Sequence, residues 1–225
     1  MRALSLALLL AVSIGSARAQ TAVSPPGLST TGQPDGFEVT GKAYVVDGHG
    51  SAKWGMSPAD VRTAAARDFP AATFAGETVD PGDGMIILTA RVPALAPGIG
   101  PATILYGFDA AAKRLAHIDI VWAIEHPSPA DRERMTAAGS SLVRDLLGHY
   151  WKLLSVMRGV PVGSDQLLLF AGAGEAGGAV NVMLEGVGYR LRRPDGVEVD
   201  VPAPASGIAV ALRMRLASIP APNTN

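Results

Sequence analysis

The chain has 225 residues, with 19 Lys+Arg, 20 Asp+Glu and no Cys. The absence of Cys excludes disulfides, thiolate metal sites and a thiol nucleophile. The near balance of charge, with no basic block, argues against nucleic acid or an anionic lipid surface as the partner of the chain.

The N-terminus predicts export. Arg2 precedes an apolar run over residues 3–14, and Ala17-Arg18-Ala19 satisfies the small-x-small rule of signal peptidase. The run is shorter than the roughly 20 residues that a membrane-spanning helix needs. We therefore expect a signal peptide at residues 1–19, cleavage near Ala19/Gln20, and a periplasmic or secreted mature chain of net charge −3 with no transmembrane segment.

A flexible leader is expected next. Residues 20–36 are rich in Pro, Gly, Ser and Thr and lack an apolar period, and the tail at 218–225 has the same character and predicts disorder. Between them, the first structure is expected to be a short strand at 37–39 and 43–46.

A helix is strongly specified after Met56. Ser57 is a good N-cap, Pro58 is suited to the first helical position, and Asp60 completes a capping-box-like pattern. Pro70 ends the helix. Strands with period two follow at 85–92, 102–108 and 115–124.

The second part of the chain repeats this order. Ser128-Pro129-Ala130-Asp131 repeats the Ser-Pro-Ala-Asp of residues 57–60 and begins a longer helix that ends near Tyr150. Strands are expected at 153–157, 166–170, 179–191, 197–201 and 207–216. The sequence thus predicts an α+β fold of two related helix-plus-antiparallel-sheet halves, 37–126 and 127–217, with the helices packed on one face of the sheet.

A glycine-rich stretch resembles a nucleotide-binding loop. Gly172, Gly174 and Gly177 spell G-x-G-x-x-G after an apolar run, and Asp200 lies where a ribose-binding acid would be expected. However, Val180, Val182 and Leu184 alternate with polar or flexible residues, which indicates a strand where the dinucleotide motif requires a helix. We therefore interpret the stretch as a hairpin connection, with a bulge near Gly186, and expect no cofactor.

The candidate metal ligands are two His and two acids within ten residues: His117, Asp119, Glu125 and His126. His117 and Asp119 share one face of the strand at 115–124, while Ile118, Ile120 and Trp122 share the other. Residues two apart on a strand are about 6 to 7 Å apart. The alternative, which this spacing favours, is a solvated outer face of the sheet.

Candidate binding-surface residues are two aromatic side chains and one acid. Trp54 lies just before the predicted helix, Tyr106 lies in the strand predicted at 102–108, and Glu175 lies in the glycine-rich loop. The alternative for the aromatic residues is a place in the half-buried core.

The segment Trp54-Gly55-Met56-Ser57-Pro58-Ala59-Asp60-Val61 resembles the (F/W)GMS-x-x-x-V start of exported bacterial proteins of unknown function. It is also distantly similar to helix starts in outer-membrane-assembly lipoproteins and in β-lactamase-inhibitor-like modules. The resemblance covers about twenty residues and implies helices packed against an antiparallel sheet and a protein-binding role. The chain departs from the lipoproteins because it has no lipobox Cys.

The function expected from the sequence is that of an exported, non-enzymatic binding or envelope-associated protein. Its partner would be a protein or small ligand in the cell envelope, and not nucleic acid. The alternative is a metal-assisted periplasmic enzyme that uses His117, Asp119, Glu125 and His126.

Overall fold

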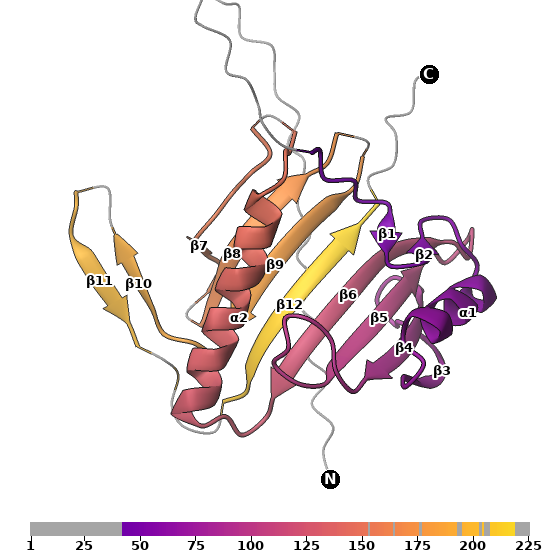
Figure 1. The fold of residues 1–225 in the computed structure, drawn as a ribbon, viewed down its shortest axis with the longest axis horizontal. Helices are drawn as coiled ribbons and strands as arrows, with labels where there is room; N and C mark the ends of the chain where they lie inside the picture. Colours follow the sequence, from indigo (N-terminus) through magenta and orange to yellow (C-terminus); the bar gives the residue numbers. More distant parts are fainter. Residues whose placement is uncertain are drawn as a thin grey trace, which may run out of the picture. The chain divides into compact units, whose positions relative to one another are not determined.

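The computed structural model describes residues 42–152, 154–163, 165–175, 177–192, 195–202, 204 and 208–218. The signal peptide, the leader, the strand expected at 37–39 and the tail after Ser218 lie outside these residues. The described part contains two helices and twelve strands (Figure 1): β1 Gly48–His49, β2 Ala52–Lys53, α1 Pro58–Asp68, β3 Thr73–Val79, β4 Ile86–Val92, β5 Ala102–Phe108, β6 Leu115–Ile124, α2 Pro129–Leu147, β7 Val160–Pro161, β8 Gln166–Ala173, β9 Ala179–Glu185, β10 Tyr189–Arg192, β11 Glu198–Val201 and β12 Val210–Ala217.

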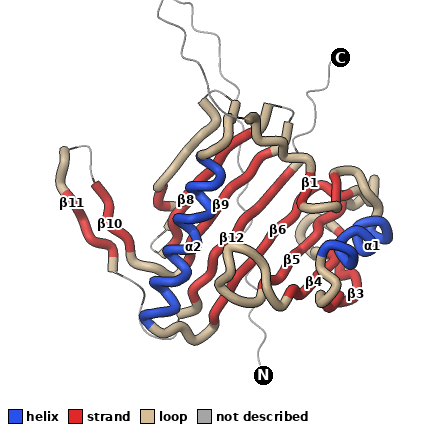
Figure 2. The backbone as a smooth tube through the Cα atoms, viewed as in Figure 1, coloured by secondary structure: helices blue, strands red, loops and turns tan. Residues whose placement is uncertain are grey.

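Eight strands form one antiparallel sheet in the order β3-β4-β5-β6-β12-β9-β8-β7 (Figure 2). β6 and β12 pair near its middle, from Ile124 opposite Val210 to His117 opposite Ala217. Two further antiparallel pairs, β1–β2 and β10–β11, are separate from this sheet. The architecture is therefore α+β and dominated by antiparallel sheet.

Both helices begin at the predicted Ser caps. The backbone N–H of Asp60 donates to Ser57 Oγ at 3.3 Å at the start of α1. At the start of α2, the Ser128 N–H donates to Asp131 Oδ2 at 2.8 Å and the Asp131 N–H donates to Ser128 Oγ, a complete capping box. The Ser128 hydroxyl, which donates to Asp131 Oδ2 at 2.6 Å, the Ser128 N–H and Arg134 together lower the pKa of Asp131 to about 2. Local sequence thus fixes where each helix starts.

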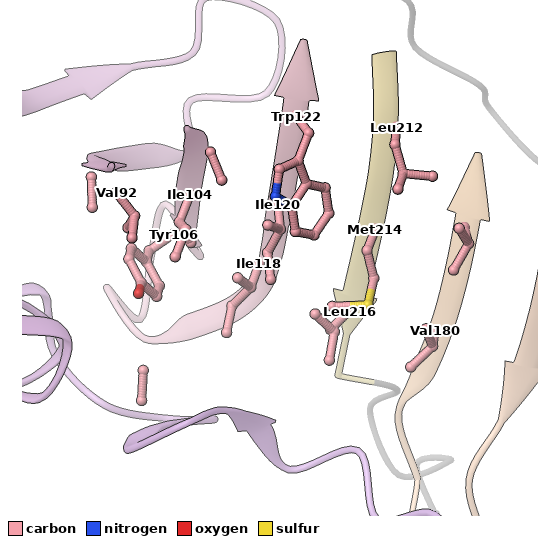
Figure 3. Packing of buried hydrophobic residues seen from close by; sticks show 14 of the residues in the cluster. Val92, Ile104, Tyr106, Ile118, Ile120, Trp122, Val180, Leu212, Met214 and Leu216 are labelled. Atoms are coloured by element: carbon pink, nitrogen blue, oxygen red, sulfur yellow. The ribbon is translucent and has the colours of Figure 1, made fainter. Parts of the chain in front are cut away.

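The alternation of side chains divides the sheet into two faces. The front face is the one on which α2 packs, and α2 contacts the strands β8, β9 and β12. Most of the front-face side chains are buried and belong to one core cluster with the buried residues of both helices, among them Val61 and Met135. Figure 3 shows part of this layer, in which the labelled residues are Val92, Ile104, Tyr106, Ile118, Ile120, Trp122, Val180, Leu212, Met214 and Leu216.

Several predicted strands are wrong or displaced. Residues 43–46 form no strand, and Ala43 makes only an isolated parallel bridge to Tyr150. The strand predicted at 153–157 is likewise reduced, in its described part, to one bridge between Met157 and Ala171. The strand predicted at 179–191 is divided into β9 and β10, because the chain turns at Gly186, whose φ is +71°.

Four strands are present that the sequence does not predict. β3 is exposed at nearly every position, so it shows no alternation of apolar and polar residues. β1, β2 and β7 have two residues each, too few for any periodicity. None of the helices in the described part of the chain is long and apolar enough to cross a membrane.

Candidate functional site

The glycine-rich stretch connects two antiparallel strands. β8 and β9 pair from Gln166 opposite Glu185 to Ala173 opposite Ala179, and the N–H of Gly174 donates to the carbonyl of Gly178 at 2.9 Å. The strand β9, and not a helix, follows the third glycine. The arrangement therefore lacks the helix N-terminus on which a dinucleotide motif depends, and the predicted hairpin connection is confirmed.

The glycines serve close packing against the segment before β1. A Cβ on Gly174 would lie 2.8 Å from the carbonyl oxygen of Tyr44, and one on Gly178 would lie 2.6 Å from that of Val46. Gly178 also has a φ of +97°. Only glycine fits both positions without a shift of backbone. Asp200, the candidate ribose acid, lies on β11 and pairs instead with Arg190 Nε at 2.8 Å.

The second face of the sheet, opposite to the one on which α2 packs, is here called the back face. Its residues follow from the strand registers, and most are half-buried or exposed. Two arginines of β12 lie near its middle, with small, polar and apolar side chains on either side. The back face consists of Ile87, Thr89, Arg91, Thr103, Leu105, Gly107, His117, Asp119, Val121, Ala123, Gln166, Leu168, Ala171, Ala173, Ala179, Asn181, Met183, Glu185, Ala211, Arg213, Arg215 and Ala217.

A charged network occupies the centre of the back face. Asp119 lies directly opposite Arg215, and its Oδ2 is 3.1 Å from Arg215 Nη2 and 3.7 Å from His117 Nε2. The Asp119 side chain is only 9% exposed. A second pair joins Arg213 Nε to Glu185 Oε1 at 3.4 Å. Burying the carboxylate of Asp119 is tolerable because the Arg215 guanidinium on the same face compensates its charge.

The position of His117 depends on the neighbouring strand. His117 lies opposite Gly107 of β5, and a Cβ on Gly107 would overlap the imidazole ring. Burial and the Arg215 guanidinium lower the pKa of His117, and the carboxylates of Asp119, Asp83 and Asp80 oppose this shift. The imidazole is therefore largely neutral at pH 7. Among the described residues, no Ser, Thr or Tyr hydroxyl hydrogen-bonds to it, so no activated nucleophile accompanies it.

The structure brings together only part of the predicted metal cluster. His117 and Asp119 are near one another, but Glu125 and His126 follow the far end of β6. Within the described ranges, no group of three or more His, Cys, Asp or Glu side chains could hold a metal ion. Because β6 is extended, ligands at its two ends are separated by many residues of about 3.3 Å each.

The candidate binding-surface residues have three different outcomes. Tyr106 is completely buried, so the expectation that it lines an exposed surface is wrong. Its side chain points into the front-face core, because it shares a strand face with Ile104 (Figure 3). Trp54 is partly buried against the core and its Nε1 donates to the Val46 carbonyl at 2.7 Å. Glu175 is exposed in the β8–β9 loop.

A second polar cluster lies at the end of α1. The Asp68 carboxylate accepts from the backbone N–H of Ser51 at 2.5 Å and from Ser51 Oγ at 2.7 Å. His49 stacks on Phe69, with ring centroids 6.1 Å apart, and burial lowers its pKa although Asp68 opposes the shift. The Ser51 hydroxyl donates directly to a carboxylate and not to an imidazole. The cluster therefore ties the β1–β2 turn to α1 and does not form a nucleophile–base pair.

Sequence reasoning missed Arg213 and Arg215. The pattern Leu212-Arg213-Met214-Arg215-Leu216 does contain the signal, because charges at alternate positions of a strand share one face. Asp119 could not be assigned as the partner of Arg215, since the β6–β12 pairing joins distant parts of the chain.

Comparisons with models of known protein families, with curated protein sequences and with solved structures found no match.

Proposed function

We propose that this protein is an exported, non-enzymatic binding protein of the cell envelope, and that its partner is a protein that docks on the back face of the sheet. The observation that carries the proposal is the ordered charged network of His117, Asp119 and Arg215 at the centre of that face. A buried ion pair is often no more stabilising than apolar residues of similar volume, so the presence of this network on a sheet surface supports a role beyond folding.

The composition around the network supports a protein as the partner. Leu105, Val121 and Met183 are half-buried; Val121 and Met183 lie opposite Arg213, and Leu105 lies opposite Asp119. The cores of protein interfaces are enriched in Arg and Met and in apolar groups, with few unpaired charges. The charges of Arg213 and Arg215 are already balanced by Glu185 and Asp119, so the face does not have the uncompensated positive charge expected of a nucleic-acid surface.

The strand order supports two related halves. Outward from the central β6–β12 pair, the sheet runs β5, β4, β3 on one side and β9, β8, β7 on the other, in reverse chain order on both. Each side is preceded in the chain by a helix that starts with Ser-Pro-Ala-Asp. We infer that a helix-plus-four-strand unit was duplicated, with β10–β11 inserted before β12, and that both helices pack on the front face. This arrangement leaves the back face to the partner.

Export is supported by the sequence of residues 1–19 and is testable separately. Mass spectrometry of the protein from an exporting host should give a chain beginning at Gln20. A chain that retains Met1 would contradict export by a cleaved signal peptide.

The binding role is tested by a charge placed on each face. Met183→Lys adds a third cation beside Arg213 and Arg215, whereas the matched control Ala137→Lys adds one to an exposed position of α2. Quantitative capture from an envelope extract should lose its specific partner with Met183→Lys and keep it with Ala137→Lys, while thermal melts show both variants folded. Equal capture by both variants would refute docking on the back face.

A further inference from the structure

An apolar segment with an unusual exposure follows α2. Leu154 is 95% exposed and Met157 is 54% exposed. Val156, Val160 and Val162 are 40%, 39% and 39% exposed. Single exposed apolar residues need no explanation. Here, however, five exposed apolar side chains lie within nine consecutive residues, and exposing so much apolar surface to water is unfavourable. These five residues are called the apolar edge segment below.

The segment is ordered and lies at the edge of the sheet. Met157 and Ala171 exchange two backbone hydrogen bonds of 2.9 Å each, and Val160 pairs with Leu168. Lys152 and Ser155, on either side of Leu154, are held to β8, since the N–H of Lys152 donates to the Ala173 carbonyl at 2.9 Å and the Ala173 N–H donates to Ser155 Oγ at 3.1 Å. The exposure of the apolar side chains is thus a property of a defined backbone.

Leu154 is held outward at a conformational cost. Its φ is +61°, in the left-handed region that a residue with a branched side chain rarely adopts. A strained backbone persists where the surrounding structure enforces it, and such positions concentrate at functional sites. Here the strain presents a leucine to the outside of the molecule, which points to a contact made by that side chain.

The charges around the segment are of one sign. Residues 147–163 contain Lys152 and Arg158 and no Asp or Glu, although the chain as a whole has more acids than bases. Both cations are exposed, and neither makes an ion pair with another described residue. Projecting apolar side chains flanked by free cations are the composition of a surface that enters the headgroup region of an anionic bilayer.

The segment is poorly suited to the addition of a partner strand. Pro161 of β7 has no N–H to donate, and Gly159, with a φ of +62°, interrupts the extended backbone beside it. Both are devices that protect a sheet edge from further pairing. A lipid surface requires no backbone hydrogen bonds, so it remains compatible with this edge.

We propose that the apolar edge segment is a peripheral membrane contact, in which Leu154 and Met157 enter an anionic bilayer surface while Lys152 and Arg158 contact lipid phosphates. The near-balanced charge of the whole chain argues against a broad attraction to anionic lipid, so the contact is local. Met157 and Val160 lie opposite Ala171 and Leu168, at the outer edge of the back face, whereas the proposed protein partner docks on the charged network at its centre, so the two proposals are tested by different variants.

The absence of Cys in the chain allows a direct test. The mature protein with the single substitution Leu154→Cys is labelled with an environment-sensitive fluorophore and mixed with vesicles of equimolar phosphatidylcholine and phosphatidylglycerol. The matched control is Val79→Cys, because Val79 is 66% exposed on β3 at the other edge of the sheet. We expect a blue shift for the label at 154 and none for the label at 79.

Vesicle sedimentation with unlabelled protein completes the test. The double variants Leu154→Ser/Met157→Ser and Lys152→Gln/Arg158→Gln should each bind the anionic vesicles at least roughly tenfold more weakly than the wild type, and Val79→Ser should bind equally well. No binding by the wild type, or equal binding by all variants, would overturn the proposal. A dimer that the Leu154→Ser/Met157→Ser variant dissociates, without vesicle binding, would assign the segment to self-association instead and overturn it as well.

Discussion

Replacing Tyr106 with Phe is expected to stabilise the protein. The Tyr106 side chain is completely buried on β5, and its hydroxyl has no hydrogen-bond partner in the structure. Burial, with a smaller contribution from Asp68, raises the pKa of Tyr106, so the group stays neutral but remains desolvated. An unsatisfied buried polar group costs about 1–3 kcal/mol. The substitution keeps the ring and its packing, so only this cost is removed.

The expected gain is about 1 kcal/mol in the free energy of unfolding, which corresponds to a rise in Tm of about 2–4 °C for a domain of this size. The matched control is Tyr189→Phe, because the Tyr189 hydroxyl donates to the Gly163 carbonyl at 2.9 Å. That variant should lose about 0.5–1.5 kcal/mol. Urea unfolding followed by circular dichroism measures both. A Tyr106→Phe variant that is less stable than the wild type would refute the reasoning, because its hydroxyl would then have a partner.

Three further predictions concern the loop, the histidines and metal. Gly178→Ala should lose about 1–3 kcal/mol of stability, because of its positive φ and its contact with Val46, and equilibrium dialysis should detect no NAD binding by the wild type; NAD binding would contradict the hairpin interpretation. The pKa values of His49 and His117 in the folded protein lie below the ordinary 6.5. As the pH falls, the unfolded chain therefore binds protons at these histidines before the folded protein does. Stability should therefore be full above pH 6.5 and fall as the pH drops below it, less steeply in a His117→Gln variant; urea midpoints that do not change between pH 7 and 5 would be inconsistent with this. Equimolar zinc should leave the Tm unchanged, whereas a stabilisation of several degrees would support the metal-assisted alternative.

The helices could be predicted because their signals are local. Ser57 and Ser128 specify each start through side-chain bonds that reach only three residues along the chain. The glycine-rich stretch was interpretable for the same reason, since Val180 and Val182 keep a period of two directly after it. Such features need no knowledge of the rest of the molecule.

Features that depend on distant pairing could not be predicted. The sequence places His117 and Asp119 on one strand face, but the contact with Arg215 exists only because β6 and β12 pair. Tyr106 has the same aromatic character as a binding residue, and only the register of β5 shows that it faces the core. The exposed edge strand β3 has no buried side, so it carries no alternation to detect.

The central claim, that the back face of the sheet docks a partner protein, is tested most directly by site-specific photo-cross-linking. A photo-reactive residue at Asn181 would lie exposed on the back face beside Arg215, and one at Glu133 would lie exposed on α2. The account predicts that envelope extracts give a discrete cross-linked protein from position 181 and none from position 133. A cross-linked protein obtained from position 133 alone would contradict it.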